Sequence, residues 1–190
     1  MNEAILTGKL VSYTYSHTIK GVKIYEGVLA VRRPSGTEDA VLFHSWKTDI
    51  QVGKTYCITG EVRTARTPNA YPKKKTYIKL KTVGEYTKPE EEQGDKNEIT
   101  LSGKLVGKTP IRQTPISRKS IIDFQIEVPQ GDSVIYPSLI AWGFTAKQVD
   151  SMEEGTEVKI SGQLHRREYL KGDGVFYIYE ISCFSVEALK

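Results

Sequence analysis

Apolar and polar residues alternate with a period of two along much of this chain. The alternation is clear at residues 121–128 of the second half. The even positions are the apolar Ile122, Phe124, Ile126 and Val128, and the odd positions are the largely polar Ile121, Asp123, Gln125 and Glu127. Residues 4–9 follow the same rule. Such alternation is typical of half-buried β-strands. Only residues 145–155 have the spacing of a helix, so the pattern predicts an all-β protein with one short helix.

The sequence contains an internal repeat of this strand pattern. NEAILTGKLV at residues 2–11 returns as NEITLSGKLV at residues 97–106, with seven of ten positions identical. Later landmarks repeat in the same order, because Trp46 is matched by Trp142 and the glycine pair 53 and 60 by the pair 155 and 162. The chain is therefore predicted to hold two copies of one β-rich module. Residues 1–88 form the first domain, residues 89–96 an acidic linker and residues 97–190 the second domain.

Each copy runs as three strands, a helix or its remnant, and two further strands. This is the order of the OB-fold, a five-stranded Greek-key barrel. The helix is expected between strands 3 and 4 of the second copy, whereas KTDIQVG in the first copy is too short for more than a turn. Gly8 and Gly103 suit the bend where the first strand serves both sides of a barrel.

Composition describes an ordinary globular chain of 190 residues, with 38% hydrophobic and 26% charged residues. No apolar run approaches the length of a membrane span, and Glu3 lies where a signal peptide needs basic residues. These features predict a cytoplasmic protein. Cys57 and Cys183 occupy non-equivalent strand positions and are interpreted as buried free thiols.

The net charge of +4 is unevenly distributed. Residues 1–88 hold 15 basic and 7 acidic residues, or +8; residues 89–96 hold 1 and 4, or −3; residues 97–190 hold 11 and 12, or −1. A polyanion would therefore be held electrostatically by the first copy, while the second contributes shape and stacking. On charge alone, a merely solvated surface explains the asymmetry equally well.

The second copy resembles the bacterial single-stranded DNA-binding (SSB) protein family over almost its whole length. The most specific motifs are AWGFTAKQV and the G-x6-G-x-L-x-x-R-x-Y pattern of residues 155–169. The stretch TPIRQTPISRKSIIDFQIEV is also similar to primosomal replication protein B relatives. The first copy is a more distant match that lacks the helix, and the tandem arrangement resembles SSB-like proteins of Firmicutes and their mobile elements.

The resemblance implies single-stranded DNA binding without base preference, in replication, recombination or repair, by stacking of bases on aromatic rings. In the second copy it places stacking residues at Tyr136, Trp142 and Tyr169. Packing of Trp142 in the core is the alternative. Phosphate contacts are expected from a further set: Arg112, Arg118, Lys119, Arg166 and Arg167.

The first copy offers a different set of candidates. Its acid-free stretch between Glu61 and Glu85 interleaves basic and aromatic residues, as a phosphate backbone with unpaired bases requires. The candidates are Trp46, Arg63, Arg66, Tyr71, Lys73, Lys74, Lys75 and Tyr77, with Arg32 and Arg33 at the turn after the second strand. A solubilising basic hairpin is the alternative. His44 shares a strand face with Trp46 and either stacks or is a satisfied polar residue.

No arrangement of catalytic residues, metal ligands or cofactor-binding loops is present in the sequence, which predicts a non-enzyme without cofactors. The family commonly assembles four OB domains, so two tandem chains are expected to form a homodimer. Two alternatives remain. The chain is either a DNA-coating module or a protein-interaction subunit of a replication or plasmid complex with weak DNA contact, and RNA binding is a third option.

Overall fold

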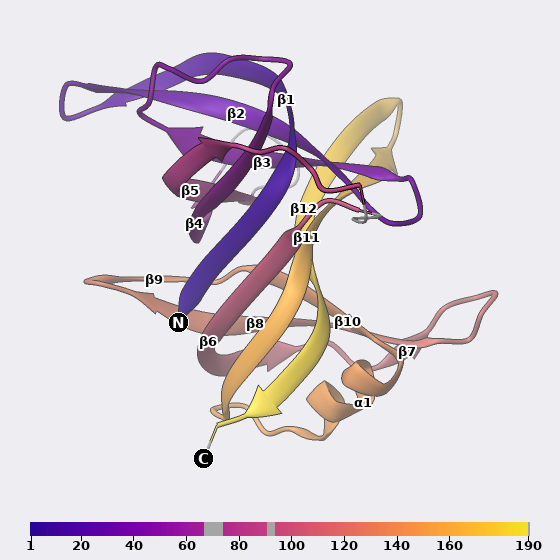
Figure 1. Cartoon of the computed structure of the whole chain (residues 1–190). Coiled ribbons are helices and arrows are strands. Elements are labelled where there is room, and N and C mark those ends of the chain that lie inside the picture. Colours follow the sequence, from indigo (N-terminus) through magenta and orange to yellow (C-terminus); the bar gives the residue numbers. More distant parts are fainter. Residues whose placement is uncertain (67–73, 91–93, 190) are drawn as a thin grey trace. The chain divides into compact units, whose positions relative to one another are not determined.

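The computed structural model describes residues 1–66, 74–90 and 94–189, without the side chains of Arg66, Lys74 and Tyr169. The chain divides into two compact units (Figure 1). We call Glu3–Arg63 with Tyr77–Glu98 the N-terminal unit, and Ile99–Lys190 with Met1–Asn2 and Thr64–Thr76 the C-terminal unit. The domain boundaries drawn from the sequence stay a prediction.

The first repeat supplies five strands. They are β1 (Asn2–Ile19), β2 (Val22–Arg32), β3 (Glu38–Ser45), β4 (Thr55–Arg66) and β5 (Lys74–Glu85). Strand β1 pairs antiparallel with both β2 and β4, β2 pairs antiparallel with β3, and β3 pairs in parallel with β5. A first strand shared by two neighbours, together with a parallel pair between the third and fifth strands, closes the sheet into a small barrel.

The second repeat has the same order with small additions. Its elements are β6 (Asn97–Lys108), β7 (Arg112–Gln113), β8 (Ser120–Gln130), β9 (Ser133–Ile135), β10 (Ser138–Trp142), α1 (Gly143–Ser151), β11 (Glu157–Lys171) and β12 (Gly174–Ala188). Strand β6 pairs with β8 and β11, β8 pairs with β10, and β10 runs parallel to β12. The all-β fold of two tandem OB barrels is confirmed, including the helix between strands 3 and 4 of the second copy.

The repeat extends to single hydrogen bonds. Gly53 and Gly155 both have a φ of +93°, a left-handed conformation that glycine adopts without strain. Gly53 donates its N–H to the carbonyl of Leu10 at 2.8 Å, and Gly155 donates to Leu105 at 2.7 Å. The glycine spacing noticed in the sequence therefore marks one turn that both copies use to enter their fourth strand.

Close backbone approach explains another repeated glycine. A Cβ atom on Gly8 would lie 2.6 Å from the carbonyl oxygen of Ala30, and one on Gly103 would lie 2.2 Å from that of Glu127. In both units the second strand thus crosses directly over the first strand at its glycine. Only a residue without a side chain fits there.

The predicted alternation of β8 is confirmed for Ile122, Phe124, Ile126 and Val128, which are all buried, but Ile121 on the opposite face is buried as well. In β1, however, Thr7 is fully buried although the pattern places it on the polar face. Its hydroxyl accepts a hydrogen bond from the Lys96 N–H at 2.6 Å, and its own N–H donates to the Lys96 carbonyl at 2.9 Å. The end of the acidic segment therefore covers this strand as an added backbone partner.

The helix begins two residues earlier and ends four residues earlier than the sequence indicates. Helix α1 follows β10 directly, with Trp142 as its N-cap and Thr145, Ala146 and Val149 buried. It stops because Met152 is extended, with φ −81° and ψ 144°. The alternation of residues 134–142 also predicts one continuous strand, but the structure breaks it at Tyr136 and Pro137, between β9 and β10. Proline has no N–H with which to continue the strand ladder.

Both cysteines are free thiols, as expected. Cys183 is buried, and this burial raises the pKa of its thiol far above the ordinary value. Cys57 is only half-buried, which corrects the expectation that both are buried.

Candidate nucleic-acid interface

A groove of about 550 Å³ crosses the outer face of the C-terminal unit. The groove lies where the end of β6 and the strands β8 and β10 meet the β11–β12 hairpin. Its lining residues are Gly107, Lys108, Thr109, Asp123, Phe124, Gln125, Ser138, Leu139, Arg167, Ile178 and Glu180. This is the face on which OB-folds bind oligonucleotides and oligosaccharides.

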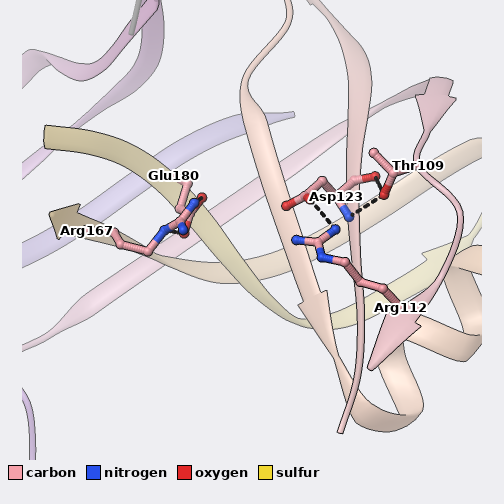
Figure 2. Close-up of polar contacts among 5 residues, drawn as sticks. All are labelled: Thr109, Arg112, Asp123, Arg167 and Glu180. Carbon is pink, nitrogen blue, oxygen red and sulfur yellow. Dashed lines mark hydrogen bonds and ion pairs between the residues drawn. The ribbon is translucent and has the colours of Figure 1, made fainter. Parts of the chain in front are cut away.

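Two arginine–carboxylate pairs lie at this groove (Figure 2). Arg112 on β7 reaches across to Asp123 on β8, with 2.6 Å between its Nη1 and the Asp123 Oδ2. Arg167 on β11 binds Glu180 on β12 through two hydrogen bonds, Nε to Oε1 at 3.0 Å and Nη2 to Oε2 at 3.3 Å. The predicted phosphate ligands Arg112 and Arg167 are therefore both paired with carboxylates.

The two pairs differ in exposure. The side chains of Arg112 and Asp123 are 49% and 39% exposed, so water reaches both partners. In the other pair Arg167 is 54% exposed but Glu180 only 12%. An exposed ion pair contributes roughly 0–1 kcal/mol, while removal of one partner from a buried pair costs considerably more. The Arg112–Asp123 pair is accordingly the one that a competing anion separates more easily.

Lys108 lines the groove, but its ammonium group is hydrogen-bonded to the C-terminal end of helix α1. Its ammonium group donates to the carbonyls of Val149 at 3.3 Å, Met152 at 2.6 Å and Asp150. These carbonyls lie in the last turn of α1 and at its C-cap Met152, where helix carbonyls run out of intrahelical donors; that of Val149 also accepts the Met152 N–H at 3.2 Å. Lys108 is not among the predicted site residues, because nothing in the sequence links it to a helix that begins 35 positions later.

Trp142 lies at the end of β10 and is 41% exposed. By the two-residue period it shares a face with Ser138, which lines the groove. The structure thus argues against core packing of this indole. Tyr136 is half-buried outside the strands, and its hydroxyl donates to the Glu127 carboxylate at 2.9 Å. That hydrogen bond raises the pKa of Tyr136.

The β11–β12 hairpin holds the remaining C-terminal candidates. The guanidinium of Arg166 lies over the ring of Tyr177, 4.6 Å from its centre, which is a cation–π contact that the sequence did not reveal. Arg118 and Lys119 are exposed in the loop before β8, where Arg118 has a φ of +48°. The side chain of Tyr169 lies outside the described residues.

The N-terminal unit has a smaller hollow of about 90 Å³ on its corresponding face. Trp46 lines it and is 47% exposed. His44 stacks on Tyr77 at 4.1 Å between ring centres, and its Nε2 lies 3.0 Å from the Glu26 carboxylate. His44 is therefore satisfied by a polar partner, while a stacking role of its ring toward a ligand stays a prediction.

His17 also lines this hollow, and a β-bulge in β1 places it there. The ladder between β1 and β2 shifts register between Tyr15 and His17, so that His17 pairs with Ile24. Its ring lies 5.7 Å from that of His44 in an edge-on arrangement. Bulges commonly turn a side chain toward a functional face. Sequence reasoning missed His17, since a bulge inside a regular alternation has no clear signal.

The basic candidates of the N-terminal half fall into three groups. Arg33 is held by the buried Asp39 through hydrogen bonds of 2.5 and 2.7 Å, and Arg63 pairs with Glu61 at 2.7 Å. Arg32 is exposed, and Lys75 is half-buried in β5. Tyr71 and Lys73 lie outside the described residues, as do the side chains of Arg66 and Lys74.

Within the described residues, no cluster of three or more His, Cys, Asp or Glu side chains could hold a metal ion. None of the helices among them is long and apolar enough to span a membrane.

Solved structures share the whole architecture. The wild-type single-stranded DNA binding protein from Thermus aquaticus is 15% identical, and the match covers 100% of this chain and 93% of that one with a TM-score of 0.75. The chain has the tandem OB-fold of that protein. A deletion mutant of the same protein matches at 16% identity with a TM-score of 0.75, covering 100% of this chain and 95% of that one.

A weaker match covers one half only. The protein priB from Ralstonia solanacearum is 16% identical over 49% of this chain and 98% of its own, with a TM-score of 0.38. No protein-family model and no curated protein sequence matches the chain. At these identities the comparisons establish the fold, and function has to be argued from the site.

Proposed function

We propose that the chain binds single-stranded DNA without sequence specificity, in support of replication, recombination or repair. The main support for this proposal is the exposure of the two tryptophans. Trp46 is 47% exposed and Trp142 is 41% exposed, at equivalent positions of the two OB barrels. A large apolar ring left open to water at the same place twice is suited to stacking on a base. Such stacking contributes roughly 1–3 kcal/mol per base and tolerates any sequence.

Charge supports the same proposal for the N-terminal half. Residues 1–88 carry a net +8, which attracts a polyanion and makes binding sensitive to salt. The charges that line the C-terminal groove cancel, because Lys108 and Arg167 are offset by Asp123 and Glu180. The N-terminal half therefore supplies most of the electrostatic attraction, while the C-terminal unit contributes its groove and Trp142.

The chain contains only two tryptophans, which allows a direct test. Trp46→Phe leaves Trp142 as the sole reporter, and Trp142→Phe leaves Trp46. We expect oligo-dT to quench the fluorescence of both variants, with affinity falling steeply as salt rises. A duplex of equal length and an oligo-rU serve as controls for strandedness and sugar. Absence of quenching and of any mobility shift at low salt would refute the proposal.

The balanced charge of the C-terminal groove favours a second candidate, a protein-interaction subunit with weak DNA contact. This alternative predicts little salt-sensitive DNA binding together with a stable complex recovered by pulldown.

For the first candidate we further propose a cytoplasmic binding protein without catalytic activity that forms a homodimer, giving four OB domains. Light scattering after size exclusion would contradict the dimer by returning a monomer at micromolar concentration.

A further inference from the structure

The Arg112–Asp123 pair at the C-terminal groove has the geometry of an arginine on a phosphate. A guanidinium binds carboxylates and phosphates through the same N–H donors and at the same distances. At 2.6 Å, the Asp123 carboxylate engages an Arg112 N–H that a strand phosphate would need. We propose that Asp123 sets the affinity of this groove by acting as an internal competitor that a phosphate must displace from Arg112.

Asp123 is fixed at its backbone and exposed at its carboxylate. Its N–H donates to the Thr109 hydroxyl at 3.2 Å (Figure 2), and its carbonyl accepts from the Thr109 N–H at 2.9 Å. Because these bonds hold the main chain and the side chain is short, the carboxylate stays near its place when Arg112 turns to another anion. Arg112 belongs to a two-residue strand paired with β8 only at Ile121 and Ser120. The arginine is thus the partner that moves.

Burial separates this pair from its neighbour. Asp123 is 39% exposed and rehydrates when Arg112 leaves, whereas Glu180 is 12% exposed and would be left charged in an enclosed place. Exchange with phosphate is therefore confined to Arg112, and Arg167 stays on Glu180. While Asp123 is ionised, it and Arg112 together add no net charge to the interface.

This inference rests on the proposed DNA binding, and the test separates the two. Asp123→Asn keeps the shape of the side chain and removes its charge. In the full chain, anisotropy of labelled oligo-dT should show binding tightened by about 3- to 10-fold at low salt. The plot of log K against log salt should steepen by up to about 0.7, the contribution of one added phosphate contact on a single strand.

Arginine variants make the assignment specific. Arg112→Gln should weaken binding by less than about twofold in the parent chain, and substantially in the Asp123→Asn background. Asp132→Asn, the same change in an exposed turn outside the groove, is the matched control and should leave the salt slope unchanged. Asp123→Ser provides a second neutral variant if the asparagine chain does not fold.

If the parent chain binds oligo-dT but Asp123→Asn binds equally or more weakly, the carboxylate orients Arg112 and the competitor role is wrong. Equal tightening by Asp132→Asn would also overturn it, since the effect would then be one of net charge. Failure of the parent chain and all variants to bind would instead reject the proposed function.

Discussion

Lys108 and Met152 are 44 positions apart, yet the Lys108 ammonium donates to the Met152 carbonyl at 2.6 Å. The same ammonium serves the carbonyls of Val149 and Asp150. A cation at the C-terminal end of a helix is stabilised by the helix dipole as well as by these hydrogen bonds. In this way the first strand of the C-terminal barrel holds its only described helix, α1, in place.

Lys108→Met keeps the aliphatic length and removes the three donors. We expect it to lower the free energy of unfolding by about 1–2 kcal/mol, because hydrogen bonds from a charged group are lost at a helix end. Urea unfolding measures the change. Lys104→Met, an exposed position on the same strand, is the control and should cost less than about 0.5 kcal/mol. Equal effects of both variants would show that Lys108 does not cap the helix.

Gly103→Ala tests the crossing of β6 and β8. The added Cβ would lie 2.2 Å from the Glu127 carbonyl oxygen, which no side-chain movement can relieve. We expect a loss of about 3 kcal/mol or more in the free energy of unfolding, in the range of strongly overpacked sites. Gly107→Ala on the same strand meets no atom within 4 Å and should cost less than about 1 kcal/mol. A thermally stable Gly103→Ala chain would contradict the crossing.

Much of this fold was predictable because its determinants are local or repeated. The recurrence of NEAILTGKLV as NEITLSGKLV and the alternation of residues 121–128 directly indicate paired strands in two modules. The shared φ of +93° at Gly53 and Gly155 explains why their spacing is kept. The break at Pro137 was also readable from proline chemistry, but the two-residue period of its neighbours concealed it.

The site was less predictable, because its partners come from distant segments. The sequence identified Trp46 and Trp142 as candidates, and both are exposed. It also identified Arg112 and Arg167 as candidates, but not that Asp123 and Glu180 lie against them, since pairing across strands depends on register. His17 was missed because one bulge changes the face on which every later residue of β1 lies.

Glu61 gives the N-terminal unit a pH dependence with a definite sign. A hydrogen bond from Lys81 at 2.7 Å is the main cause that lowers the pKa of Glu61 below the ordinary 4.5, and Arg63 adds to it. A carboxyl group with a depressed folded-state pKa stabilises the fold above its unfolded pKa and loses that contribution as pH falls through the folded value. The stabilisation is therefore complete above the unfolded-state pKa, near the ordinary 4.5, and is lost progressively as the pH falls through the lower folded-state value.

Glu61→Gln should accordingly be less stable than the parent chain at pH 7, by about 0.5–1 kcal/mol because Lys81 is largely exposed. The difference should vanish as the pH approaches 3. Thermal unfolding across pH 3–7 measures it, with Glu98→Gln at an exposed strand position as control. A gap that widens toward low pH would show that the carboxylate is not stabilised by Lys81.

Trp142→Ala tests the stacking surface of the C-terminal unit. Removal of the indole should weaken binding to oligo-dT by about 10-fold, because a stacked base contributes roughly 1–3 kcal/mol. Trp142→Phe retains a flat ring and should lose less than about threefold. Trp142→Ala should also lower the free energy of unfolding, because more than half of the residue is covered, whereas Trp142→Phe should change it little. Anisotropy with labelled oligo-dT gives the affinities, and a thermal melt verifies folding. A folded Trp142→Ala chain that binds as tightly as the parent would remove this tryptophan from the interface and leave Trp46 as the stacking tryptophan.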